Sequence, residues 1–318
     1  MGLLLAVACR SSAERVFEVV GSAPAFVGLV ETPACAISVN DLGAAVCIDA
    51  AGQTPWRAEV CHPVRHRPTI IGGTLWVACE NGEWHGVDVK SGKPRWKQPG
   101  RRVPISGLAS DGLRGFVAGD GGVVEVIDET GATQWSVRGG PRLAAGGDVL
   151  AVASLDGGLA VFDATHGGAL WADEKAVVAL AGTDGVVLAA RAAGDVVAWD
   201  TKTGAPRWGV TLGAIVPDSL SVEGERIWVG LASREVVELS AVGGAEKGRF
   251  RLTGLLAAPV HAGVASVSGR DGCAVVLATG QNVCADHALR GSAVLLDGVL
   301  LLGPRDGRVL GFRPRRSP

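Results

Sequence analysis

Tyrosine is absent from this sequence of 318 residues, and methionine occurs only once. Neither sign of charge dominates, because 30 Lys and Arg residues stand against 32 Asp and Glu residues, for a net charge of −2. A chain with this balance has no overall attraction for nucleic acid or for an anionic membrane surface. No apolar run approaches the roughly 18 residues that a membrane-spanning helix needs. We therefore expect no nucleic-acid partner and no transmembrane segment.

Motifs for catalysis are also missing from the sequence. It has no phosphate-cradling glycine loop, no nucleophile elbow and no zinc-protease helix motif. No linker or low-complexity stretch divides the chain, so residues 1–318 are expected to form a single domain. These absences predict a protein with no catalytic residue, no cofactor-binding residue and no bound cofactor.

Glycine is the residue present in excess, with 47 copies, which is about twice the usual share. Short runs of Val, Ala and Leu are interrupted by Asp-Gly pairs, as at Asp120-Gly121 and Asp156-Gly157. Asp-Gly is favoured in the tight turns of β-hairpins. The composition therefore predicts an all-β protein of many short antiparallel strands.

One turn signature recurs along the chain and is clearest from Asp200 through Gly204 to Trp208. The Asp side chain can accept backbone N–H bonds within such a turn, and Gly adopts a positive φ there without steric cost. The Gly-to-Trp distance is constant, so each indole falls at the same point of its repeat. We expect it to act as a structural docking residue that wedges between neighbouring sheets. The anchor positions are Phe17, Trp56, Trp96, Trp135, Trp171, Trp208, Phe250 and Cys284.

These anchors divide the chain into eight units of 34 to 42 residues. Four short strands with a period near 40 residues are typical of a β-propeller. The last unit supplies only three strands, whereas residues 15–20 form a spare strand at the other end of the chain. Pairing Arg15–Val20 with Arg308–Arg313 would close the ring and leave no open edge there. The sequence thus predicts an eight-bladed propeller of four-stranded antiparallel blades, closed by its N-terminal strand.

The pattern A-x-D-x-x-T-G-x-x-x-W, carried by Ala198 to Trp208, resembles the pyrroloquinoline-quinone-like propeller repeat with its tryptophan-docking motif. The resemblance covers essentially the whole chain and is specific for the fold. That superfamily includes quinoprotein dehydrogenases, the propeller lipoprotein of the outer-membrane barrel assembly machine, and many sensor or scaffold domains. WD-repeat propellers are the alternative at the level of fold, but their Gly-His pairs are missing here.

The resemblance leaves two classes of function to compare. Quinoprotein enzymes, as it implies, are much longer and carry a vicinal cysteine pair, a calcium site and an active-site Asp. This sequence has no adjacent cysteines, and its Asp residues lie largely in turns. We therefore predict a non-catalytic, monomeric scaffold or assembly factor that binds protein partners. The alternative is a small-molecule or quinone binder, or a quinone-dependent oxidoreductase, that uses the central channel.

Seven cysteines are scattered among apolar strands, which favours small buried side chains with free thiols. Two pairs, Cys35 with Cys47 and Cys273 with Cys284, fall on neighbouring strands, so disulfides are the alternative there. Cys61, His62 and His66 form the one local cluster of soft-metal ligand types, with Cys79 and His85 nearest in sequence. A closed zinc site needs four ligands, and solvated loop residues are the simpler interpretation of this cluster.

The first nine residues, MGLLLAVAC, have two interpretations. They form either an extra strand or the end of a secretory signal, in which Cys9 would be the lipid-modified residue of a bacterial lipoprotein. No positively charged region precedes the apolar run, and the run is short for a signal peptide. The second interpretation favours the cell envelope, and a cytoplasmic location is the alternative.

Several loops that join one predicted blade to the next are basic. Because consecutive blades are neighbours, these residues would form an arc over three blades. Arginine suits the bidentate binding of carboxylates, so the arc predicts a docking surface for an acidic partner, against the alternative of a solvated rim. The candidate partner-binding residues are Arg65, His66, Arg67, Arg101, Arg102, Arg138 and Arg142.

Overall fold

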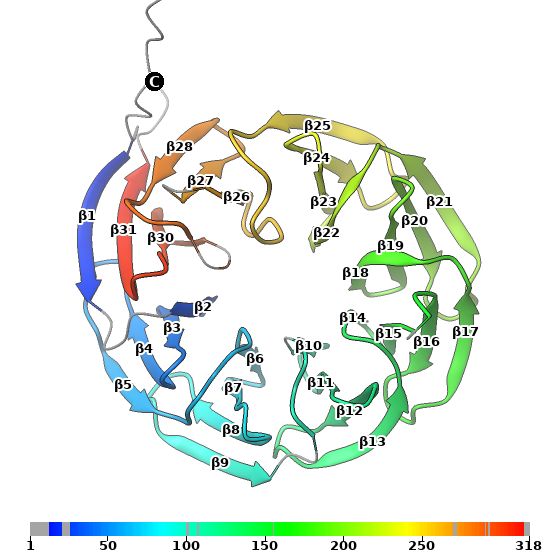
Figure 1. Cartoon of the computed structure of the whole chain (residues 1–318), viewed down its shortest axis with the longest axis horizontal. Helices are drawn as coiled ribbons and strands as arrows, with labels where there is room; N and C mark the ends of the chain where they lie inside the picture. Colours follow the sequence, from blue (N-terminus) through cyan, green and yellow to red (C-terminus); the bar gives the residue numbers. More distant parts are fainter. Residues whose placement is uncertain are drawn as a thin grey trace, which may run out of the picture.

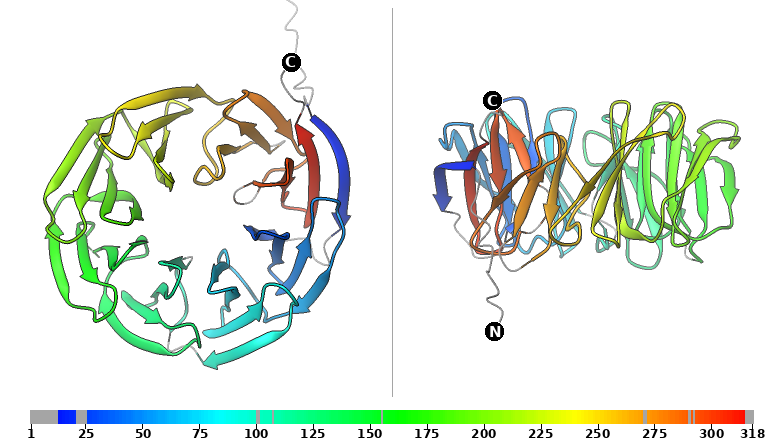
Figure 2. Two further views of the ribbon diagram at one scale, coloured as in Figure 1. Left: turned by 180° about the vertical axis from the view of Figure 1, so that it is seen from behind. Right: turned by 90° about the horizontal axis from the view of Figure 1, so that it is seen from above.

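The computed structural model describes residues 13–20, 26–99, 102–106, 108–154, 156–269, 272–289, 291 and 293–314. Within these ranges the chain forms 31 strands in eight antiparallel sheets. The sheets stand side by side around a central axis (Figure 1). Seen from the edge, the ring is a short cylinder (Figure 2). The predicted eight-bladed propeller is confirmed.

Each blade runs from an inner strand at the channel to an outer strand at the rim, in chain order. The first four blades are β2 (Phe26–Glu31), β3 (Ala36–Asn40), β4 (Ala44–Ile48), β5 (Trp56–Glu59); β6 (Thr69–Ile71), β7 (Thr74–Ala78), β8 (Glu83–Asp88), β9 (Pro94–Pro99); β10 (Ala109–Ser110), β11 (Gly115–Gly119), β12 (Val123–Ile127), β13 (Thr133–Arg138); and β14 (Leu143–Gly146), β15 (Val149–Ala153), β16 (Leu159–Asp163), β17 (Ala169–Asp173).

The remaining blades are β18 (Val177–Thr183), β19 (Val186–Arg191), β20 (Asp195–Asp200), β21 (Pro206–Thr211); β22 (Ile215–Glu223), β23 (Arg226–Leu231), β24 (Glu235–Ser240), β25 (Glu246–Arg251); β26 (Val264–Val267), β27 (Cys273–Val276), β28 (Gln281–Cys284); and β29 (Val294–Leu296), β30 (Val299–Leu302), β31 (Arg308–Pro314), with β1 (Ala13–Val20) outermost. In the blade of β26 to β28, the inner segment pairs with β26 only through isolated bridges, Leu256 with Val267 and His261 with Val264.

The ring closes where β1 pairs with β31, and Figure 1 shows the two strands side by side. Phe17 lies opposite Gly311, and Val20 lies opposite Arg308. The predicted pairing of the N-terminal strand with the last blade is thus confirmed. The first nine residues, including Cys9, lie outside the described part of the chain.

The core is a ring of apolar layers between neighbouring blades. The second strand of several blades is buried along its whole length, as in β7, β11 and β15. Such strands carry apolar side chains on both faces because a sheet on either side covers them. One layer joins Leu29 and Val46 to Leu301 and Val309, so the first and last blades share a core.

The junctions between blades repeat one arrangement, shown by Trp171. Its Nε1 donates a hydrogen bond to the carbonyl oxygen of Thr201, in the signature turn of the next blade, at 2.9 Å. Its ring lies against Gly204 (φ +68°), where a Cβ atom would fall 2.7 Å from the indole. Asp200 Oδ1 accepts the backbone N–H groups of two turn residues and holds the turn in shape. The same pair of contacts joins Trp56 to Val89 and Gly92, Trp96 to Glu129 and Gly131, Trp135 to Thr165 and Gly167, and Trp208 to Ala241 and Gly244.

Burial of these indoles is less complete than that of an interior wedge. All five lie on outer strands, where Trp56 is buried and Trp96, Trp135, Trp171 and Trp208 are half-buried. The largest fully buried aromatic side chains are Trp76 and Trp228, on second strands. The signature tryptophans therefore join neighbouring blades at their outer edge rather than fill the core.

The arrangement changes at the remaining anchors. Phe17 packs on Gly52 of the first blade without a hydrogen bond from its ring, which has no N–H group. Phe250 does not reach Gly280 of the next turn, and instead its ring centroid lies 6.0 Å from that of Trp228 in its own blade. Cys284 is bound to Cys273, its cross-strand partner. The junctions on either side of the β26–β28 blade therefore lack the aromatic wedge.

Two glycines at equivalent turn positions test the wedge directly. Gly204 and Gly280 have φ values of +68° and +65°, but an added Cβ meets Trp171 only at Gly204, and at Gly280 it meets nothing within 4 Å. We expect Gly280→Ala to cost about 1 kcal/mol through its positive φ alone. Gly204→Ala should cost about 1–3 kcal/mol more, because it overpacks the junction. Chemical denaturation of both variants measures the difference, and equal losses would contradict the wedge.

The signature turns also predict how stability depends on pH. The guanidinium of Arg95, with the hydroxyl and backbone N–H of Ser91, lowers the pKa of Asp88 from its usual 3.8 to about 2. A lowered carboxyl pKa stabilises the fold above the unfolded pKa, and this contribution disappears as the pH falls through the folded pKa. Asp88→Asn should thus be less stable than wild type at pH 7, and the difference should shrink between about pH 4 and pH 2. Urea unfolding across this range measures it, and a difference independent of pH would exclude the ion pair as its cause.

Candidate interaction face and central cavity

Two sets of connections meet at one end of the blades. They are the loops from each outer strand to the next inner strand, and the hairpins between second and third strands. Isolated bridges from Val64 to Cys79 and from Pro104 to Gly119 join a loop of the first kind to a hairpin of the second. We call this end the loop face. The signature turns lie at the opposite end, the turn face.

The first basic loop lies between β5 and β6. Arg65 is exposed, and its Nε lies 3.1 Å from Glu80 Oε2 in the adjacent hairpin. His66 Nε2 lies 2.9 Å from the carbonyl oxygen of Pro104 in the next loop along the ring. Arg67 points back along the inner strand β2, where its Nη2 donates to the carbonyl oxygen of Leu29 at 2.9 Å. Burial lowers the pKa of Arg67 below its usual value. Arg67 and His66 thus connect neighbouring blades, and Arg65 is the member of this loop that faces solvent.

The next two loops supply two more exposed arginines. The stem of Arg102 covers Gly119, and its Nη1 donates to the carbonyl oxygen of Asp120 at 3.1 Å. Arg138 is exposed at the end of β13. Arg101 lies outside the described residues. The structure therefore places Arg65, Arg102 and Arg138 on three consecutive blades of the loop face, and whether they form a docking surface stays a prediction.

Apolar side chains lie on the same face as these arginines. Leu42, Val103 and Ile105 are 47%, 41% and 44% exposed. Leu42 lies in the hairpin between β3 and β4, and the other two flank Pro104 in the loop that enters β10. The backbone N–H of Ile105 donates to the carbonyl oxygen of Ala118 and so ties this loop to the second strand of its blade. This part of the loop face therefore combines exposed aliphatic side chains with guanidinium groups.

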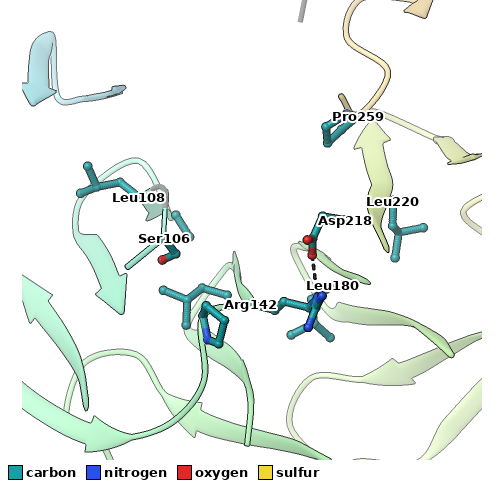
Figure 3. Close-up of a pocket in the computed structure, with 10 residues that line it drawn as sticks. Ser106, Leu108, Arg142, Leu180, Asp218, Leu220 and Pro259 are labelled. Carbon is teal, nitrogen blue, oxygen red and sulfur yellow. Dashed lines mark hydrogen bonds and ion pairs between the residues drawn. The ribbon is translucent and has the colours of Figure 1, made fainter. Parts of the chain in front are cut away.

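Arg142 differs from the other arginines because it points into the central channel. Its Nε donates to Asp218 Oδ1 at 2.7 Å, across the blade that separates β14 from β22 (Figure 3). Asp218 reaches the channel because β22 leaves its ladder between Ile215 and Leu220. Ser219 closes this bulge, with its Oγ 2.6 Å from the carbonyl oxygen of Val216. The sequence analysis did not identify Asp218. The one local signal of an irregular strand is the preceding Val216-Pro217, because proline disfavours the interior of a strand.

The Arg142–Asp218 pair lines a cavity of about 230 Å³ within the channel. The other lining residues are mostly apolar and come from five blades: Ser106, Leu108, Ala109, Pro141, Leu143, Leu180, Leu220 and Pro259. The two charged residues of this lining form an ion pair with one another. Three carboxyl groups whose pKa is lowered, those of Asp88, Asp163 and Asp200, lie in signature turns and not in this cavity. The described lining thus combines mostly apolar side chains with one ion pair.

The prediction of free thiols is wrong for six cysteines. Disulfides join Cys35 to Cys47, Cys61 to Cys79 and Cys273 to Cys284. The first and third are the pairs left as alternatives by the sequence, and both connect neighbouring antiparallel strands. The second was missed because Cys61 lies in a loop whose position the strand register did not define. The bridge between Val64 and Cys79 brings that loop beside the hairpin.

The structure separates the weak metal candidates Cys61, His62 and His66, for which solvated loop residues were the favoured interpretation. His62 Nδ1 lies 3.2 Å from the carbonyl oxygen of Asp41, and His66 is bonded to Pro104. Neither joins Cys61 in a common site. The group that does converge is Cys61, Cys79 and His85, whose ligand atoms lie within 4.8 Å of one another.

Comparison with known proteins gives the chain its relatives. The family model described as outer membrane protein assembly factor BamB matches residues 41–177 and 155–316. The chain is 28% identical over 170 residues to the outer membrane protein assembly factor BamB of Bordetella pertussis, and 31% identical over 172 residues to that of Burkholderia pseudomallei. Each alignment covers 49% of this chain and 44% or 45% of the relative. The chain thus spans less than half the length of these curated relatives.

Solved structures support the fold alone, because their sequence identity is low. BamB from Moraxella catarrhalis superposes with a TM-score of 0.71 at 15% identity, over 96% of this chain and 99% of that one. Sqt1 from Saccharomyces cerevisiae superposes with a TM-score of 0.74 at 14% identity, over 96% of this chain and 100% of that one.

The contribution of the Arg142–Asp218 ion pair to the stability of the ring can be measured. Its side chains are 32% and 64% exposed, so we expect a coupling energy of only about 0.2–1 kcal/mol. A double-mutant cycle with Arg142→Ala and Asp218→Ala, measured by denaturation at low and high salt, gives this energy. We expect it to fall with added salt. A coupling of several kcal/mol that salt leaves unchanged would show that the pair is buried and supports the whole ring.

Proposed function

This chain belongs to the outer membrane protein assembly factor BamB family, and we propose that it is a non-catalytic scaffold in the assembly of outer membrane proteins. The observation that carries the proposal is the family match, which extends over nearly all eight blades. A propeller suits this role because its ring holds many loops on one rigid face. In this proposal the chain acts as a single monomeric propeller, and the partner is a protein of the assembly apparatus.

The loop face is our candidate for the surface that binds this partner. Exposed aliphatic side chains stabilise a complex when binding removes their surface from water. Single exposed hydrophobic residues are common on proteins, but three on one face beside arginines are typical of interaction sites. Arginine is enriched at the centres of protein interfaces. We propose that Arg65, Arg102 and Arg138 bind carboxylates of the partner, while Leu42, Val103 and Ile105 pack against its apolar groups.

A quinone-dependent enzyme is the alternative from another class, and the cavity gives it little support. Arg142 and Asp218 are the charged groups of its described lining, and they are bonded to each other. The sequence also has no adjacent cysteines. We therefore propose that the channel has a structural role.

The cell envelope is the compartment that we propose. Disulfides persist in oxidising compartments and are rare in the cytosol, and three of them link described residues of this chain. A lipid anchor at Cys9 would agree with this location and stays a prediction. Among the described residues, no helix is long and apolar enough to cross a bilayer.

The proposed surface can be tested with the combined variant Arg65→Ser, Arg102→Ser and Arg138→Ser. In a strain that lacks this gene, wild type should restore the level of folded outer membrane proteins, and the variant should not. Exposed substitutions usually change stability by less than about 0.5 kcal/mol, so the purified variant should melt with wild type. Binding to proteins of the assembly apparatus should also weaken with added salt, because exposed charges are screened over about 8–10 Å.

Arg226→Ser is a matched control on the turn face. Arg226 is likewise exposed and paired with a carboxylate, at 3.5 Å from Glu238. It is the first residue of β23, directly after the hairpin from β22. This control should behave as wild type in both assays. Full restoration by the triple variant would contradict the proposal that the partner binds these arginines of the loop face. A deletion strain with unchanged outer membrane proteins would contradict the proposed function itself.

A further inference from the structure

Cys61, Cys79 and His85 lie together at the loop-face end of the second blade. Cys61 is in the loop that follows β5, Cys79 follows β7, and His85 lies in β8 opposite Val77. One ligand atom of each residue lies within 4.8 Å of the others. In the described part of the chain, no other group of three such residues converges in this way. Of the three disulfides, this one alone therefore has an imidazole beside it.

The backbone holds these residues in place independently of the disulfide bond. The segment around Cys61 is fixed on both sides, because Val60 and Val64 donate their N–H groups to the carbonyl oxygens of Gly43 and Asp41, both at 2.9 Å. Its carbonyl also sits where Gly43 has no Cβ, which an added Cβ would overlap. The N–H of Cys79 donates to the carbonyl oxygen of Glu83 at 2.9 Å. Opening the disulfide would thus leave both sulfur atoms beside the imidazole.

The imidazole of His85 is oriented by its neighbours. Its Nε2 lies 3.4 Å from Glu83 Oε2, and Glu83 in turn is paired with Lys97 at 2.7 Å. The His85 side chain is only 14% exposed. A carboxylate that accepts the proton on one ring nitrogen leaves the other nitrogen unprotonated, which is the usual second shell of a zinc-bound histidine.

We propose that Cys61, Cys79 and His85 form a thiol-dependent zinc site that the Cys61–Cys79 disulfide closes. Two thiolates and one imidazole are a known ligand set for zinc, with the fourth position open to water. Ligand atoms around a tetrahedral zinc lie about 3.5–3.8 Å apart, so side-chain rotations bring these three atoms into coordination. The partly exposed Cys61 gives the ion and the reductant access from the loop face.

The chemistry of opening the site balances with a dithiol reductant. The reductant gives two electrons and two protons to the Cys61–Cys79 bond and itself becomes a disulfide. The two new thiols then lose two protons to solvent as they bind Zn²⁺. Zinc has no redox chemistry of its own, so the bound ion blocks reformation of the disulfide rather than driving it.

The test is zinc binding by the purified full chain before and after treatment with a dithiol. Binding of Zn²⁺ is measured by competition with a chromophoric chelator, and Co²⁺ serves as a spectroscopic probe of thiolate ligands. We expect the reduced chain to bind one Zn²⁺ at this site and the oxidised chain to bind at least about 100-fold more weakly. His85→Gln should weaken binding by the reduced chain at least about 10-fold, since even second-shell changes cost about 10- to 100-fold.

His62→Gln is the matched control, because His62 adjoins Cys61 but contacts Asp41 instead. It should bind Zn²⁺ as wild type does. Equal affinity of His85→Gln and wild type, or equal affinity of the oxidised and reduced chains, would overturn the proposal. Cys61→Ser combined with Cys79→Ser should abolish the cobalt–thiolate absorption. Should that variant fail to fold, the comparison of His85→Gln with His62→Gln decides the question, with melting curves confirming that both fold.

Discussion

Every sheet in this ring must be covered on both faces by its neighbours, and the rest of the structure depends on that constraint. It explains why second strands such as β7 and β15 are buried along their whole length, and why a residue from one blade so often completes a turn in the next. The tryptophan junctions meet the constraint at the rim with one hydrogen bond and one glycine contact each. At the loop face, His66 and Arg67 meet it with bonds to carbonyl oxygens of adjacent blades.

Most of the fold could be predicted from the sequence because the turn signature combines three local requirements in one short stretch. Asp, Gly and Trp each have a separate physical role there, so their spacing identifies a blade even where the strands themselves are ordinary. The signature loses its value where one role is missing. The ring of Phe250 has no N–H group and packs near Trp228 in its own blade. Cys284 is joined to Cys273. At those positions the repeat defines a strand but not the contact between blades.

The candidate site was harder to predict, because its residues lie in connections whose paths the repeat does not define. Seven basic residues were expected to act alike, but the direction of each loop separates them. Arg67 turns inward along β2, Arg142 crosses the channel to Asp218, and Arg65 stays at the surface. Asp218 depends on a local departure of β22 from its ladder. The disulfide of Cys61 depends on a single bridge between a loop and a hairpin, which no periodicity in the sequence marks.

The pairing of β1 with β31 also determines the order in which the chain can fold. Arg308 reaches Glu18 across 290 positions of sequence, and contacts of such long range form late because loop-closure entropy opposes them. Strand β1 precedes its partner β31 by all the other described strands, so the ring cannot close until the last of these strands has been synthesised.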